Sequence, residues 1–107
     1  MNKFNARKIR LDGYNFASQF EANGYAEAVL RLKAKEISDL RVHTRLPIKI
    51  GSVTVCAVES DIDYIEERTG KRVYIDFKGK DTAISKLKRK LVCAMYPAID
   101  WQVVYSR

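Results

Sequence analysis

The hydrophobic and polar positions of the first half of the chain follow a helical pattern. Between residues 16 and 36, apolar side chains recur at intervals of three and four, as on one face of an α-helix. The residues of this predicted core face are Tyr25, Ala28, Val29 and Leu32. Glu21 continues the same stripe one turn earlier, where a carboxylate is costly unless it has a partner. Glu21 is therefore the helix acid that most needs an explanation.

A second helix is predicted over residues 83–95, after a cap at Asp81 or Thr82. Pro97 ends the helical pattern. The apolar side chains of this helix also form one stripe along one face: Ile84, Leu87, Leu91 and Met95.

Between and after the helices, the pattern changes to short runs of β-branched residues bounded by turn residues, which predicts strands. The predicted strands cover residues 41–50, 53–65, 73–78 and 100–105. Residues 1–12 are interpreted as a basic N-terminal arm or a short edge strand. The predicted order is α-β-β-β-α-β, an α/β fold with a mixed central sheet flanked by helices. A length of 107 residues favours one domain, residues 1–107.

From its composition we expect the protein to be cytoplasmic. Hydrophobic residues make up 47 % of it, enough for a core, but no apolar run is long enough to span a membrane. No signal peptide opens the chain. Cys56 and Cys93 have apolar neighbours, so we interpret them as buried thiols in a reducing compartment.

The net charge of +7 is concentrated in one segment. Residues 68–90 hold nine Lys and Arg side chains against two aspartates, so this segment accounts for the whole excess. Such a surface favours a polyanionic partner, most simply nucleic acid, although a solvated basic face is the alternative. The residues expected to contact nucleic acid are Lys80, Lys86, Lys88, Arg89 and Lys90. Because Lys88 lies beside the apolar stripe, we expect it to point toward the site.

Candidate chemistry appears in the run VYIDFKGK, residues 73–80, where a predicted strand ends with Asp76 and Lys78. Residues two apart in a strand point to the same face, so these two side chains are expected to lie together. The triplet D-x-K is a weak signal alone, because it occurs by chance in many strands. Its significance depends on the other acidic and basic residues of the chain.

Asp63 lies at the end of the preceding predicted strand, and a hairpin turn at Gly70 would bring it close to Asp76. The turn does not fix the register of this hairpin. Asp61 and Glu59 lie on the same face as Asp63, so either can share or replace its role.

Neighbouring carboxylates repel one another unless a cation lies between them, and oxygen ligands suit Mg²⁺, with Mn²⁺ as a substitute. A metal held by Asp63, Asp76 and Glu21 would polarise a phosphodiester and lower the pKa of a bound water. Lys78 would orient that water or stabilise charge at phosphorus. The alternative is that these acids form ordinary salt bridges with basic side chains.

Taken in order, these residues resemble the PD-(D/E)XK nuclease superfamily, the restriction-endonuclease-like fold. The chain is most similar to small phage-encoded endonucleases and junction resolvases of that superfamily. The resemblance spans roughly residues 12–97, in the stretches DGYNFASQFEA, IDYIEERTGKRVYIDFKG and TAISKLKRKLVCAMYP. It implies a restriction-endonuclease-like αβββαβ core with four catalytic residues: Glu21, Asp63, Asp76 and Lys78. Two departures are Ile62 where the superfamily often has proline, and Asp76 where glutamate is commoner.

The resemblance implies a Mg²⁺-dependent endodeoxyribonuclease. With 107 residues there is little room for a sequence-reading module, so we expect selectivity for branched or Holliday-junction-like DNA. Symmetrical cutting of two strands needs two active sites, so we expect a homodimer, acting in the host cytoplasm if a phage encodes it. Two alternatives stay open: a catalytically inactive nucleic-acid-binding protein on the same fold, and an interaction protein whose acids only form salt bridges.

Overall fold

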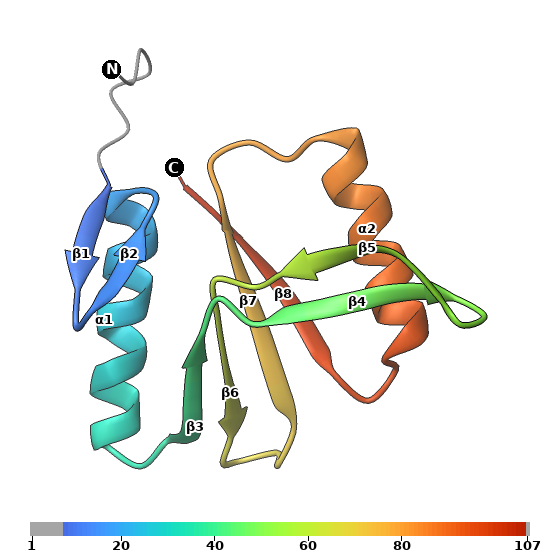
Figure 1. Cartoon of the computed structure of the whole chain (residues 1–107). Coiled ribbons are helices and arrows are strands. Elements are labelled where there is room, and N and C mark those ends of the chain that lie inside the picture. Colours follow the sequence, from blue (N-terminus) through green and yellow to red (C-terminus); the bar gives the residue numbers. More distant parts are fainter. Residues whose placement is uncertain (1–7, 107) are drawn as a thin grey trace.

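The computed structural model describes residues 8–106, which form a mixed α/β protein with two helices and eight strands (Figure 1). In chain order the elements are β1 (Ile9–Leu11), β2 (Tyr14–Phe16), α1 (Gln19–Lys33), β3 (Ile37–Val42), β4 (Arg45–Ile50), β5 (Val53–Glu59), β6 (Ile62–Glu66), β7 (Arg72–Lys78), α2 (Ala83–Met95) and β8 (Asp100–Tyr105). The two helices and the last two strands lie where the hydrophobic pattern predicts them.

A four-stranded mixed sheet forms the centre, in the order β3-β6-β7-β8. Strand β6 is antiparallel to both β3 and β7, whereas β8 runs parallel to β7 after the crossover through α2. Between β6 and β7, Ile62 lies opposite Ile75 and Asp63 opposite Tyr74. The pairing ends at Ile62, and one residue earlier the Asp61 N–H still donates to the Ile75 carbonyl, next to Asp76 in β7.

Strands β3–β4 and β5–β6 are the two arms of one bent β-ribbon, with β3 paired to β6 and β4 to β5. At the bend, His43 has a left-handed backbone with a φ of 55°, and its N–H donates to the Asp61 carbonyl at 3.0 Å. The predicted strands 41–50 and 53–65 are both interrupted here. The outer half of the ribbon, β4–β5, leaves the sheet and packs on α2 (Figure 1).

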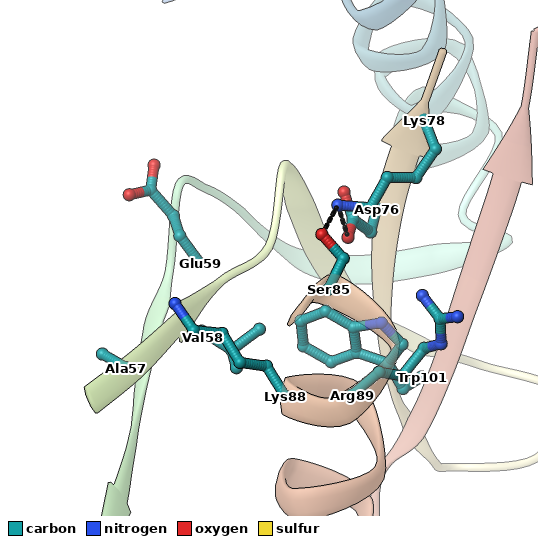
Figure 2. A pocket seen from close by; sticks show the side chains of 9 residues that line it. All are labelled: Ala57, Val58, Glu59, Asp76, Lys78, Ser85, Lys88, Arg89 and Trp101. Carbon is teal, nitrogen blue, oxygen red and sulfur yellow. Dashed lines mark hydrogen bonds and ion pairs between the residues drawn. The ribbon is translucent and has the colours of Figure 1, made fainter. Parts of the chain in front are cut away.

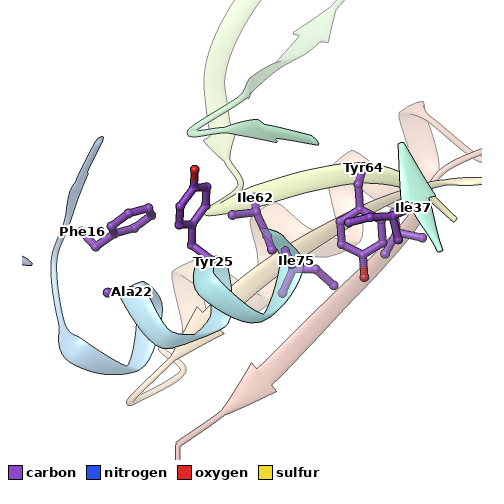
Figure 3. Close-up of a cluster of buried hydrophobic side chains, with 9 residues drawn as sticks. Phe16, Ala22, Tyr25, Ile37, Ile62, Tyr64 and Ile75 are labelled. Atoms are coloured by element: carbon purple, nitrogen blue, oxygen red, sulfur yellow. The ribbon is translucent and has the colours of Figure 1, made fainter. Parts of the chain in front are cut away.

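The main core lies between α1 and one face of the sheet (Figure 3). Its buried residues are Phe16, Ala22, Tyr25, Ala28, Ile37, Ile62, Tyr64, Val73 and Ile75. Of the predicted core face of α1, Tyr25 and Ala28 are buried, whereas Leu32 in the last turn is exposed. Close packing explains why position 24 is a glycine, since a Cβ at this position would lie 2.1 Å from Cζ of Phe77. The α1–sheet contact therefore reaches the strand that carries Asp76.

Helix α2 turns its apolar stripe away from the core. Only Val92 is buried, in a second cluster with Ile48 and Val58 of the ribbon. The four residues of the stripe lie on one face as predicted, and their exposed fractions run from 38 % to 67 %: Ile84, Leu87, Leu91 and Met95. Periodicity locates an apolar face but not the neighbour that covers it.

Strands β1 and β2 form a hairpin whose turn residues, Asp12 and Gly13, have φ of 53° and 83°. Asp-Gly is a preferred pair for such a turn. The predicted N-terminal arm lies partly outside the described residues, and from residue 9 onward the chain forms strand β1.

Both cysteines are free thiols. Cys56 is half-buried, but Cys93 is exposed, which contradicts its predicted burial. Among residues 8–106, no helix combines the length and apolar character needed to cross a membrane.

Candidate functional site

The end of β7 presents Asp76 and Lys78 on one face of the sheet, as their spacing predicts. Lys78 Nζ lies 3.2 Å from Asp76 Oδ2 and 3.3 Å from Ser85 Oγ (Figure 2). Thr82, the N-cap of α2, donates from its hydroxyl to Ser85 Oγ at 3.0 Å and accepts from the Ser85 N–H at 3.1 Å. The ammonium group is therefore held between the strand and the first turn of α2.

Asp61 lies just before β6, where its carboxyl group interacts with that of Asp76. Its Oδ2 accepts a hydrogen bond of 2.6 Å from the Phe77 N–H, and its own N–H donates to the Ile75 carbonyl at 3.0 Å. Burial raises the pKa of the Asp61 carboxyl to about 7, although the Phe77 N–H acts in the opposite direction. The charges of Glu21 and Asp76, and a hydrogen bond with Asp76, raise this pKa further. The carboxyl groups of Glu21 and Asp76 are thus close enough to Asp61 to affect its charge at this end of the sheet.

Glu21 also has a structural role at the start of α1. The N-cap Ser18 accepts the Glu21 N–H at its hydroxyl oxygen (3.2 Å), and Glu21 Oε2 accepts the Ala17 N–H (3.0 Å). This exchange is similar to a capping box, which the S-x-x-E spacing in the sequence signals. Glu21 is therefore fixed at the helix start while its charge acts on Asp61.

Asp63 does not join these acids. It is fully buried, and its Oδ2 accepts from Arg41 Nη2 at 2.6 Å and from Arg72 Nη1 at 2.7 Å. Its Oδ1 accepts from the Thr44 hydroxyl at 2.5 Å. Both carboxylate oxygens of Asp63 are occupied by donors from neighbouring strands and the ribbon bend.

The structure therefore does not bring together the three acids and the lysine in the way that the sequence predicts. Asp76, Lys78 and Glu21 lie as expected, but Asp61 takes the place expected of Asp63. The physical reason is the β6–β7 register, which puts Tyr74 rather than Asp76 opposite Asp63. Glu59, the other alternative, is exposed at the end of β5 and pairs with Arg45 at 3.9 Å.

A cavity of about 190 Å³ opens beside Asp76 and Lys78 (Figure 2). Its lining comes from β5, β7, α2 and β8: Ala57, Val58, Glu59, Asp76, Lys78, Ser85, Lys88, Arg89 and Trp101. Trp101 forms an aromatic wall, stacked on Tyr74 with a centroid separation of 5.8 Å. Its buried indole Nε1 has no hydrogen-bond partner among the described residues.

The basic residues of α2 divide into two groups. Lys88 and Arg89 line the cavity, as predicted for Lys88, whereas Lys86 and Lys90 are exposed, as is Lys80 before the helix. Arg89 is paired with Asp81 at 2.7 Å. Lys88 is half-buried and makes no hydrogen bond or ion pair within residues 8–106. It is the lining cation whose charge is least compensated.

The acids fit a hard divalent cation by their chemistry. No three His, Cys, Asp or Glu side chains in the described part of the chain form a ready-made metal site. The charge of Asp76 helps to raise the pKa of Asp61, however, and a cation between the two carboxylates would favour their charged forms. Asp61 and Asp76 would hold such a metal, with Glu21 beside them.

Comparison of the chain with curated proteins and with solved structures finds no match. One family model matches residues 1–106. The chain therefore belongs to the family described as "Protein of unknown function (DUF1064)".

Proposed function

We propose that this protein is a metal-dependent endodeoxyribonuclease that hydrolyses phosphodiester bonds in branched DNA. The proposal rests on one observation, the grouping of Asp61 with Asp76 and Lys78, of which the last two line a cavity with a cationic wall. Carboxylate oxygens for a hard cation and a nearby ammonium group are what phosphodiester hydrolysis requires.

The order of the central elements supports the proposal. Without the β1–β2 hairpin and the outer ribbon β4–β5, the order is α1-β3-β6-β7-α2-β8, with β8 parallel to β7. As part of the proposal we assign these elements to a restriction-endonuclease-like αβββαβ core. A fold hosts many activities, so the activity itself is argued from the site.

Each residue of the site has a distinct role in the proposed reaction. Asp61 and Asp76 bind Mg²⁺, which when bound polarises the phosphoryl group and lowers the pKa of a coordinated water. Lys78, fixed by Ser85, stabilises the negative charge that develops on the phosphate or orients the attacking water. Lys88 binds a neighbouring phosphate, since Arg89 is already paired with Asp81.

The exposed lysines around the site favour recognition of DNA shape. Lys80, Lys86 and Lys90 are free to contact backbone phosphates, which position a protein on DNA without reading its sequence. We therefore propose a branched substrate, such as a flap or a four-way junction.

The second candidate is a nucleic-acid-binding protein on the same fold that does not cut. Two observations favour this second candidate. Lys78 forms an ion pair with Asp76, and no three potential ligands form a ready-made metal site within residues 8–106. Cleavage that depends on a divalent metal separates the two candidates.

The test is cleavage of labelled duplex, single-stranded, flap and four-way-junction DNA, and of a matched RNA junction, in Mg²⁺, Mn²⁺ or EDTA. Asp76→Ala and Lys78→Ala should each lower the cleavage rate by at least about 10²-fold and leave most DNA binding intact. The matched control is Asp100→Ala, an acid on β8 whose strand partner is Val73 at the far end of β7. Tight metal-independent binding without cutting supports the second candidate, and unchanged cleavage in Asp76→Ala contradicts the site.

A further inference from the structure

Helix α2 exposes its entire apolar face. Its large members, Ile84, Leu87, Leu91 and Met95, have exposed fractions from 38 % to 67 %. Ala83 and Ala94, also exposed, extend this face on one side, beyond Leu87 on the helical wheel. At 3.6 residues per turn, these six residues cover a face about 120° wide, as wide as the stripe that normally packs on a core.

The side of α2 that faces the protein is mostly polar. Ser85, Lys88 and Arg89 lie around the one buried residue, Val92, because positions i, i+3, i+4 and i+7 share a face. The helix thus uses its polar side to line the cavity and leaves its apolar side without a partner in the described chain. Full burial of an exposed large aliphatic side chain is worth about 1.5–3 kcal/mol, and each of these partly exposed side chains would gain a part of that from a partner.

The exposed apolar surface continues onto the tip of the β-ribbon. The Lys49 N–H lies 3.3 Å from Met95 Sδ, which places the ribbon tip at the C-terminal end of the stripe. At this tip Ile50 and Val53, which pair with each other, are 72 % and 63 % exposed. We call the six large side chains together the α2 surface: Ile84, Leu87, Leu91, Met95, Ile50 and Val53.

The area of the α2 surface is close to what a stable dimer needs. The exposed fractions of its six residues correspond to a little over three fully exposed aliphatic residues. That is on the order of 600 Å² per chain, whereas a stable interface buries about 800 Å² per partner, including its polar rim.

We propose that a second copy of this chain covers the α2 surface and forms a two-fold dimer. A two-fold interface must be complementary to itself. The stripe meets this condition, since an antiparallel copy of α2 would place Leu87 against Leu91 and Ile84 against Met95 across the axis. The small Ala83 and Ala94 at the edge allow the two helices to approach closely.

The charges on α2 favour a second copy over a polyanion on this surface. None of the lysines lies within this face. Lys86 points about a third of a turn from its centre, whereas Lys90 and Lys88 lie just beyond its two edges. The stripe itself carries no charge. DNA or an anionic lipid would bind the lysine side of the helix, whereas the uncharged stripe matches another apolar stripe.

The first experiment is the solution mass from about 1 to about 100 μM by sedimentation equilibrium, which does not depend on nuclease activity. The wild type should reach twice the chain mass of 12.3 kDa, and Leu87→Glu and Leu91→Glu should stay at the chain mass. The matched control is Leu30→Glu, an exposed leucine of α1 that should keep the dimer. Circular dichroism checks that all three variants stay folded, which their exposed positions predict.

The second experiment tests the antiparallel pairing. In a Cys56→Ser and Cys93→Ser background, a chain with Leu87→Cys is mixed with a chain with Leu91→Cys and oxidised. The mixture should give a disulfide-linked dimer at several times the yield of either chain alone. A wild type that stays monomeric, a dimer that survives both glutamate variants, or a monomer that uses Leu87 to bind anionic vesicles or DNA would overturn the proposal.

Discussion

Two aspartates that lie two residues apart, Asp61 and Asp63, have opposite surroundings. Asp63 is fully buried among donors, with Arg41 and Arg72 on one oxygen and the Thr44 hydroxyl on the other. Asp61 accepts one short hydrogen bond, from a backbone N–H, and its other strong neighbours are acids.

The difference shows which of the two acids is available for chemistry. A carboxylate between two guanidinium groups already has its charge compensated, so a metal would have to displace those partners. Asp61 instead lies beside other carboxyl groups, and burial, followed by the charges of those acids, raises its pKa. By this comparison Asp63 stabilises the fold, and Asp61 is the acid that a metal would stabilise.

The largest expected effect is a loss of cleavage activity when Asp61 is replaced but not when Asp63 is replaced. Asp61→Asn should lower the rate of metal-dependent junction cleavage by about 10³-fold, because it removes a proposed ligand while its amide oxygen still accepts the Phe77 N–H. Asp63→Asn should cut at nearly the wild-type rate per folded molecule. The measurement is single-turnover cleavage, normalised to the folded fraction from circular dichroism. Equal losses in both variants would remove the distinction between a structural and a functional aspartate.

The next largest effect is on stability, where the Asp63 variant should lose more than the Asp61 variant. Asp63→Asn should lower the free energy of unfolding by about 3 kcal/mol, because Arg41 and Arg72 lose the charge that they share. Asp61→Asn should leave stability unchanged or raise it at pH 8 in EDTA, since it removes one of three repelling carboxyl groups. Urea unfolding of both variants measures the two values.

The pH dependence of stability has a definite sign. The folded-state pKa of Asp61 is about 7, above the value of about 3.9 expected in the unfolded chain. Asp61 therefore makes the metal-free wild type lose stability as pH rises from about 4 through about 7. The stability of Asp61→Asn relative to the wild type should rise over the same range, and a constant difference between pH 5 and pH 8 would contradict this account.

Local signals explain why most elements could be predicted from the sequence. Residues 83–95 form α2 and residues 100–105 form β8, because helix period, caps and strand alternation are set by neighbouring residues. The β1–β2 hairpin also had a local signal, since Asp12 and Gly13 favour its turn. The prediction did not use it.

The choice between Asp61 and Asp63 had no local signal. Alternation along a strand detects a register shift of one residue, which turns apolar side chains outward. A shift of two leaves every side chain on its original face, so both acids fit the sequence pattern equally well. The bend at His43 and the outward stripe of α2 depend in the same way on contacts between distant segments.

The smallest expected effect concerns the metal itself. A ligand that binds only the folded state at ten times its Kd raises the free energy of unfolding by about 1.4 kcal/mol. Mg²⁺ should stabilise the wild type and Asp63→Asn by the same increment, because the Asp61–Asp76 pair is intact in both. Asp61→Asn and Asp76→Asn should lose most of it. Thermal unfolding across a Mg²⁺ series measures this increment for each variant.

The control for the metal series is NaCl at matched ionic strength, because salt alone screens repulsion among surface lysines and among the acids. An increment that NaCl reproduces is screening, and it would be the same in all four proteins. An increment specific to Mg²⁺ but lost in Asp63→Asn would place the metal beside Arg41 and Arg72, against the electrostatics of that site. Only an increment that depends on Asp61 and Asp76 and not on Asp63 agrees with two neighbouring aspartates in separate roles.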